Sequence, residues 1–231
     1  MAGGAAEDLD DLIRRVDPDR WLTSRFVADP AARADVVALY AYDHELARAR
    51  RVASTPLLAE IRLAWWREAV DEIFADGPLR RHPVAEALAG AVRRHDLPRP
   101  LLEAMIDGQL EALEAPTLDA PAAVAWAEAV EASLARLAAR ILDPSADSVA
   151  VAAAGRAWGL ALLIRAGAVS RETAAAPLRA ALNAARADRF SVAALPAALP
   201  ARLARFDLAG RAPGPLAKRL SLVLAAATGR I

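Results

Sequence analysis

Apolar residues recur at helical spacing along most of the chain, and short polar or proline-containing breaks separate the apolar stretches. Alanine, leucine, arginine and glutamate dominate these stretches, and all four are strong helix formers. We find no segment in which apolar and polar residues alternate as in a half-buried strand. The pattern therefore predicts an all-α protein with helices over residues 5–16, 30–51, 56–75, 83–95, 99–114, 119–142, 147–168, 171–188 and 213–228.

Proline marks several of the expected helix ends. Asp29-Pro30 and Thr55-Pro56 each place a residue that can cap a helix directly before a proline at the first helical position. The segment 190–215 contains four prolines. We expect short turns there, followed by the last helix.

The third predicted helix is strongly amphipathic. Leu58, Ile61 and Trp65 fall on one helical stripe, which continues to Glu68 and Glu72. Acidic side chains on an inner apolar stripe are potential ligands in the cavity of a helical bundle. The alternative, which we favour, is that these glutamates are solvated and neighbour arginines.

The composition of the 231-residue chain excludes several kinds of site. The absence of cysteine excludes a disulfide framework, thiol catalysis and cysteine-bound zinc or iron–sulfur centres. His44, His82 and His95 lie too far apart for a local two-histidine zinc motif, and there is no phosphate-binding glycine loop or nucleophile elbow. The 29 basic residues balance the 29 acidic ones, so we expect no nucleic-acid partner.

The charges are unevenly distributed. Residues 1–115 carry 21 acids and 15 bases, whereas residues 116–231 carry 8 acids and 14 bases. Opposite net charges favour docking of the two halves within the fold, and they leave open that the basic half meets anionic lipid or an acidic partner. The acidic start lacks a secretory pattern, and Arg156 and Arg165 interrupt the most apolar stretch. We expect a bacterial cytoplasmic protein without a transmembrane segment, with peripheral association at the inner face of the membrane as an open alternative.

Five short segments resemble, in order, motifs of the squalene/phytoene synthase family, the head-to-head prenyltransferases. They are ALYAYDHELARAR at 38–50, Trp66-Arg67-Glu68, His82-Pro83-Val84, Ile106-Asp107-Gly108 and the helical stretch from Gly155 to Ala166. The resemblance implies the isoprenoid synthase fold, a single-domain helical bundle around a central cavity. We expect residues 1–18 to form an N-terminal helical extension and residues 19–231 to form the synthase-like domain.

The positions that bind metal in this family are replaced here. In the family, two aspartate-rich segments face each other and hold Mg²⁺ ions that bind the substrate diphosphate. The corresponding positions of this chain are Ala47, Arg48 and Arg51 in the first segment, and Leu162 and Ala166 in the second. The resemblance therefore predicts no metal site, no cofactor and no catalytic residue in this chain.

The implied cavity would still be lined by side chains of the matched segments. We expect the ligand-pocket residues to be Tyr40, Asp43, Arg48, Arg51, Trp66, Asp107, Trp158 and Arg165. An unpaired buried guanidinium is costly, so the arginines need partners. We expect internal acids such as Asp43, Glu45 and Asp107 to supply them, and the alternative is an external anion such as a lipid phosphate.

Three functions remain open, and we favour a non-catalytic scaffold. The chain looks closest to a branch of the family with eroded aspartate motifs, which acts in the assembly of respiratory complex I in mitochondria. A second function is metal-free binding of an isoprenoid lipid or prenyl diphosphate, with Arg48, Arg51 and Arg165 holding the phosphate. A third is an active prenyltransferase of isoprenoid biosynthesis. The expected partner is accordingly a protein or an isoprenoid lipid.

Overall fold

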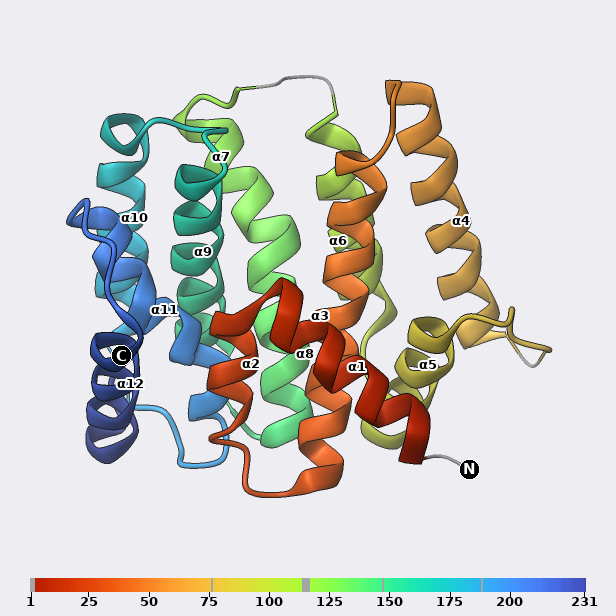
Figure 1. Cartoon of the computed structure of the whole chain (residues 1–231), viewed down its shortest axis with the longest axis horizontal. Helices are drawn as coiled ribbons and strands as arrows, with labels where there is room; N and C mark the ends of the chain where they lie inside the picture. Colours follow the sequence, from red (N-terminus) through yellow and green to blue (C-terminus); the bar gives the residue numbers. More distant parts are fainter. Residues whose placement is uncertain (1–2, 76, 114–116, 147, 188) are drawn as a thin grey trace.

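The computed structural model describes residues 3–75, 77–113, 117–146, 148–187 and 189–231. These residues form helices and loops, with no strand among them, so the all-α prediction is confirmed (Figure 1). None of the helices in this part of the chain is long and apolar enough to cross a membrane. The helices are α1 (Gly3–Val16), α2 (Pro18–Ser24), α3 (Pro30–Arg51), α4 (Pro56–Phe74), α5 (Pro83–His95), α6 (Arg99–Glu111), α7 (Ala120–Trp126), the π-helical η1 (Ala127–Ala132), α8 (Ser133–Leu142), α9 (Ser148–Arg165), α10 (Arg171–Ala185), α11 (Leu195–Leu208) and α12 (Pro215–Thr228).

Side-chain caps define where several helices begin. The Asp29 carboxylate accepts hydrogen bonds from the backbone N–H groups of Ala31 and Ala32, both at 3.1 Å. The Thr55 hydroxyl accepts one from the N–H of Leu58 at 3.4 Å. These caps satisfy N–H groups that have no partner within the helix. Both helix starts are the predicted ones.

Two helices differ from the prediction for their segments. The turns expected over 190–215 are wrong for residues 195–208, which form α11, and α2 was not predicted at all. Pro200 lies inside α11, where it removes one backbone hydrogen bond and normally disfavours a helix. Burial explains the difference, because every residue from 195 to 201 is buried.

The helix predicted over 119–142 is present as three consecutive segments, α7, η1 and α8. Its π-helical part, η1, packs against α9 at very short range. A Cβ atom at Gly155 of α9 would lie only 2.4 Å from the backbone carbonyl oxygen of Glu131 in η1. Glycine is therefore required at this crossing, and the close approach fixes the position of Glu131.

The helices pack as one bundle (Figure 1). The α3 helix, the η1–α8 segment and α9 stand side by side in its middle, and the red α1 and α2 cross in front of them. One apolar cluster surrounds α3, α5, α6 and α8, and a second surrounds η1, α9, α10 and α11. The two clusters adjoin where η1 continues into α8, so no separate halves form.

The buried face of α4 is not the predicted one. Leu63, Trp66 and Val70 are buried, whereas Leu58 is 42% and Ile61 56% exposed. The predicted inner stripe is therefore wrong. Successive residues of a helix are rotated by about 100°, so Leu58 and Ile61 point away from the face that carries the buried residues.

The two glutamates of that stripe lie at the surface, as the favoured alternative held. Arg80 binds both, with its Nη2 atom 3.1 Å from Glu68 Oε2 and 2.7 Å from Glu72 Oε1. Their partner comes from the loop after α4 and not from the same helix. Hydrogen bonds from Arg80 lower the pKa of Glu72.

Candidate ligand cavity

A cavity of about 940 Å³ lies between α2, α3, η1 and the C-terminal part of α9. We call it the central cavity. Its charged side chains come from residues 17–20, from α3, from η1 and from the end of α9. Leu162, Leu163 and Ala166 supply apolar surface opposite them. The volume suits a small or medium-sized ligand.

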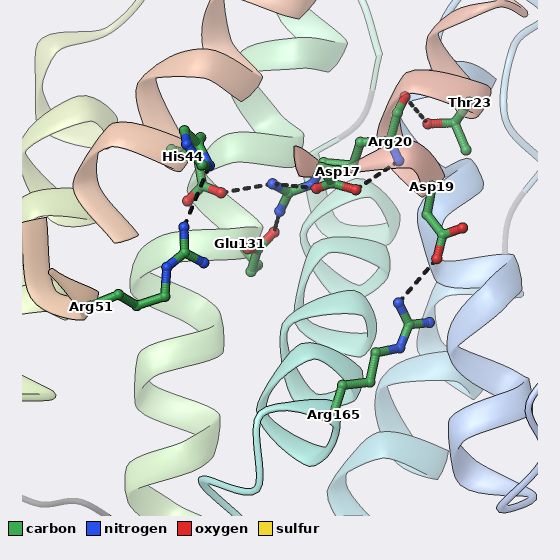
Figure 2. A network of polar contacts seen from close by, with 9 residues as sticks. Asp17, Asp19, Arg20, Thr23, His44, Arg51, Glu131 and Arg165 are labelled. Atoms are coloured by element: carbon green, nitrogen blue, oxygen red, sulfur yellow. Dashed lines mark hydrogen bonds and ion pairs between the residues drawn. The ribbon is translucent and has the colours of Figure 1, made fainter. Parts of the chain in front are cut away.

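Arg20 holds three carboxylates together in the network shown in Figure 2. Its guanidinium donates a hydrogen bond to Asp43 Oδ2 at 2.7 Å, forms an ion pair with Glu131, and lies 3.4 Å from Asp17 Oδ2. The Arg20 side chain is 4% exposed. Burial opposes its charge, but the three carboxylates outweigh burial and raise the pKa of Arg20 well above its ordinary value. Arg20 is therefore a permanent buried cation.

Three carboxylates around one guanidinium leave an excess of negative charge. Burial raises the pKa of Glu131 to about 8; Asp43 and Asp17 add to this shift, and Arg20 opposes it. Burial also raises the pKa of Asp17. A proton held on Glu131 near neutral pH offsets part of the excess. One arginine and one proton together thus offset most of the negative charge of the three carboxylates.

Asp19 forms a second set of ion pairs beside the first. Its carboxylate accepts hydrogen bonds from Arg165 at 3.1 Å and from Lys218 of α12. Arg165 also donates two hydrogen bonds of 2.8 Å to Asp207 of α11, and it lies over the ring of Trp158 at 4.6 Å. These contacts join α2 to α9, α11 and α12.

The end of the cavity formed by α3 carries two arginines that no carboxylate among the described residues neutralises. The side chain of Arg50 has no hydrogen bond or ion pair within the described ranges. The side chain of Arg51 has one hydrogen bond within them, between its Nη2 and His44 Nδ1 at 3.5 Å. Burial and Arg51 lower the pKa of Arg50, and the same two causes lower the pKa of His44. We call His44, Arg50 and Arg51 the basic cluster. Its chemistry suits an anion.

Two buried polar atoms of the same cavity also lack partners. Gln109 Oε1 and Trp126 Nε1 form no hydrogen bond within the part of the chain that the structure describes. Both residues line the central cavity, and they are 1% and 8% exposed. Buried polar groups are normally paired with protein, water or ligand. One acceptor and one donor are therefore available to a bound molecule.

The structure brings half of the predicted pocket residues together. Tyr40, Asp43, Arg51 and Arg165 all line the central cavity. Burial raises the pKa of Tyr40 to about 12, so this phenol stays neutral beneath the guanidinium of Arg20. A role for these four residues in ligand binding stays a prediction.

The other four predicted residues lie elsewhere. Arg48 and Trp66 line a smaller cavity of about 270 Å³ between α3 and α4. Asp107 is exposed and forms an ion pair with Arg67, and Trp158 is buried in the core behind Arg165. These positions separate them from the central cavity.

One of the three arginines has an expected acid as its partner, and the other two do not. Asp43 binds Arg20, whereas Arg48 binds Glu45 at the surface at 3.3 Å. Of the three arginines expected to need neutralisation, Arg51 is the one without a carboxylate partner among the residues described.

Sequence reasoning missed the centre of the network, Arg20 and Glu131. A weak signal existed for Arg20, because Asp17-Pro18-Asp19 combines a helix cap with two acids directly before it. No comparable signal marked Glu131. Its direction depends on η1 and on the close packing against α9.

A family model described as squalene/phytoene synthase matches residues 13–212, which is most of the chain. The chain belongs to the squalene/phytoene synthase family. Solved structures of family members agree in fold. A dehydrosqualene synthase in complex with a ligand covers 97% of this chain and 96% of its own length, with a TM-score of 0.77 and 12% identity. The squalene synthase HpnC from Alicyclobacillus acidocaldarius covers 98% and 94%, with a TM-score of 0.64 and 16% identity. At these identities the likeness shows the isoprenoid synthase fold alone.

Sequence relatives point to one branch of the family. A Bos taurus protein named NADH dehydrogenase (ubiquinone) complex I, assembly factor 6, is 36% identical over 98 residues, which are 42% of this chain and 28% of that protein. The Rattus norvegicus protein of the same name is 31% identical over 160 residues, 68% of this chain and 47% of that protein. The expected resemblance to complex I assembly factors is confirmed. This synthase-family chain spans less than half the length of these curated relatives.

The residues of the cavity do not fit the Mg²⁺ cluster implied by the family. Four of the five positions that correspond to the family's metal ligands line the central cavity, and they are Ala47, Arg51, Leu162 and Ala166. The carboxylates that do line it are engaged by arginine or lysine. Within the described ranges, no group of three histidine, aspartate or glutamate side chains is placed to hold a metal ion. That the protein functions without Mg²⁺ stays a prediction.

Proposed function

We propose that this synthase-family protein is non-catalytic and assists the assembly of a membrane-bound respiratory complex of the complex I type. The observation that carries the proposal is the network in which Arg20 binds Asp43, Glu131 and Asp17. The similarity to complex I assembly factor 6 supports the choice of partner.

The chemistry of diphosphate ionisation explains why this network matters. A departing diphosphate carries several negative charges, and divalent cations on paired carboxylates neutralise them. In this cavity a guanidinium is fixed among the carboxylates, and it cannot dissociate in exchange for a metal. Arg20 joins α2 to α3 and η1, so the buried carboxylates of the cavity serve to hold helices together. A rigid, catalytically inert bundle is suited to a scaffold.

Deletion of the gene in its native host tests the proposal. We expect less assembled complex I on native gels and lower NADH:quinone oxidoreductase activity of membranes, with succinate dehydrogenase unchanged. Complementation with the intact chain should restore both. Unchanged complex I together with altered isoprenoid lipid content would refute the proposal and favour a synthase.

A second candidate function is the metal-free binding of an isoprenoid phosphate ester. The basic cluster supports it, because His44, Arg50 and Arg51 line the central cavity without a carboxylate partner among the residues described. Apolar surface from α9 lies in the same cavity. A phosphate on the arginines and a hydrocarbon chain along the α9 wall would satisfy both surfaces.

Thermal melts with farnesyl monophosphate or farnesyl diphosphate, in the presence of EDTA, test this second function. We expect stabilisation of the intact protein and none of the variant that combines Arg50→Gln with Arg51→Gln. Arg48→Gln is the matched control, because Arg48 lies on the same helix but outside the central cavity. Equal stabilisation of all three proteins, or of none, would refute metal-free binding at the basic cluster.

A further inference from the structure

The last helix, α12, has an apolar face that nothing in the described part of the chain covers. It packs against α11 through Leu222 and Ala225, which are buried. On the opposite side Leu216, Leu220, Val223 and Leu224 are 73%, 71%, 55% and 55% exposed. These four residues follow the spacing of one helical stripe. We call them the α12 stripe, and an exposed apolar stripe of this kind marks a contact with another surface.

Basic side chains border the stripe, and this end of the sequence contains no acidic side chain. The last acidic residue is Asp207, and Arg211, Lys218, Arg219 and Arg230 follow it. Lys218 is engaged by Asp19. The side chains of the other three are exposed, and none pairs with a carboxylate in the described ranges. Arg219 lies directly beside the stripe on the helix surface.

Further arginines lie on the other flank of α12. Arg202 of α11 donates a hydrogen bond to the Ser221 hydroxyl at 3.0 Å. Burial lowers the pKa of Arg202, and the neighbouring Arg205 and Arg186 lower it further. Cations therefore flank the apolar stripe on both sides.

We propose that α12 docks this protein onto the surface of an anionic lipid bilayer. The α12 stripe inserts among the acyl chains near the headgroups, and the flanking arginines lie against the lipid phosphates. A second copy of the chain fits this surface less well. In a symmetric dimer the same patch faces itself, which would bring the arginines of both copies together without acids. The inference rests on α12 and its neighbours and does not depend on the role of the central cavity.

Co-sedimentation of the full chain with vesicles tests the proposal. We expect binding to phosphatidylcholine vesicles that contain phosphatidylglycerol, and weak binding to phosphatidylcholine alone. The partition coefficient of the variant that combines Leu220→Gln with Leu224→Gln should be lower by about tenfold or more, because each substitution removes apolar area from the contact with the bilayer. Arg211→Gln with Arg219→Gln should lower binding to the anionic vesicles in particular.

The matched control is Leu57→Gln with Ile61→Gln on α4. These two side chains also lie four residues apart and are 63% and 56% exposed. The control should bind like the unmodified protein, and circular dichroism should show all variants folded. No vesicle binding, equal loss in the control, or loss in the arginine variant alone would overturn the proposal. A dimer in solution that the Leu220→Gln, Leu224→Gln variant converts to monomers would also overturn it, since a second copy would then cover the stripe.

Discussion

Replacing Arg20 by alanine removes the cation that neutralises the carboxylates of the central cavity. The Arg20 side chain is 4% exposed, and its partners Asp43 and Glu131 are 10% and 3% exposed. Removing one member of a buried ion pair typically costs roughly 3–5 kcal/mol of folding free energy, because the remaining charges lose their partner. For a chain of this length that corresponds to a fall in melting temperature of roughly 6–20 °C.

The loss should depend on pH in a defined direction. Without Arg20 the pKa values of Glu131 and Asp17 rise further, since burial and the repulsion between the carboxylates are no longer opposed. A carboxyl whose pKa is raised in the folded state contributes most at low pH and loses that contribution as pH increases. The difference between the variant and the intact protein should therefore be smaller near about pH 5 than near about pH 8.

Urea and thermal unfolding of Arg20→Ala at both pH values measure this loss. Arg48→Ala is the control, because the Arg48–Glu45 pair is exposed and should contribute no more than about 1 kcal/mol. A variant as stable as the intact protein at about pH 8 would refute this reasoning.

Three further predictions concern single residues. Glu131→Gln should flatten the dependence of unfolding free energy on pH between about pH 5 and about pH 9. The Glu131 pKa of about 8 lies above its ordinary value, so the contribution of Glu131 to stability falls as pH rises through that range. If urea unfolding showed the same pH dependence for the variant and the intact protein, the raised pKa would be contradicted. Gly155→Ala should destabilise the protein by about 1–3 kcal/mol, because the added Cβ meets the backbone of η1. Gly90→Ala in α5 should be neutral or stabilising, because there the added Cβ meets only the flexible end of Arg94. The reverse order of melting temperatures would exclude the close approach of α9 to η1. Asp29→Ala should cost about 1 kcal/mol by removing the α3 cap, and a melting temperature equal to that of the intact protein would show that the cap is dispensable.

Much of the fold follows from the sequence, because helical spacing and proline positions are local signals. The starts of α3 and α4 are predicted correctly from a capping residue followed by proline. The same signals fail for α11, where the prolines of residues 190–215 suggested turns but the burial of residues 195–201 stabilises a helix. They also fail for the inner face of α4, because Leu58 and Ile61 are apolar yet exposed. Local pattern does not reveal which apolar residues meet a neighbour.

The candidate site was less accessible to prediction for a related reason. The matched motifs placed Ala47, Arg51, Leu162 and Ala166 at the cavity, and the structure has them there. The charge that neutralises the cavity comes from Arg20, which lies outside every matched motif, and pairs with Glu131 across 111 residues of sequence. A pairing over such a distance is set by the tertiary fold and leaves no trace in spacing.

A product assay tests most directly whether the cavity has lost prenyltransferase chemistry. The purified full chain is incubated with farnesyl or geranylgeranyl diphosphate, Mg²⁺ and NADPH, and the organic extract is examined by mass spectrometry. We expect no squalene, dehydrosqualene or phytoene above the level of a heat-denatured control, because Arg20 occupies the carboxylates and Ala47, Arg51, Leu162 and Ala166 supply none. Formation of any of these products in a Mg²⁺-dependent reaction would contradict the central claim.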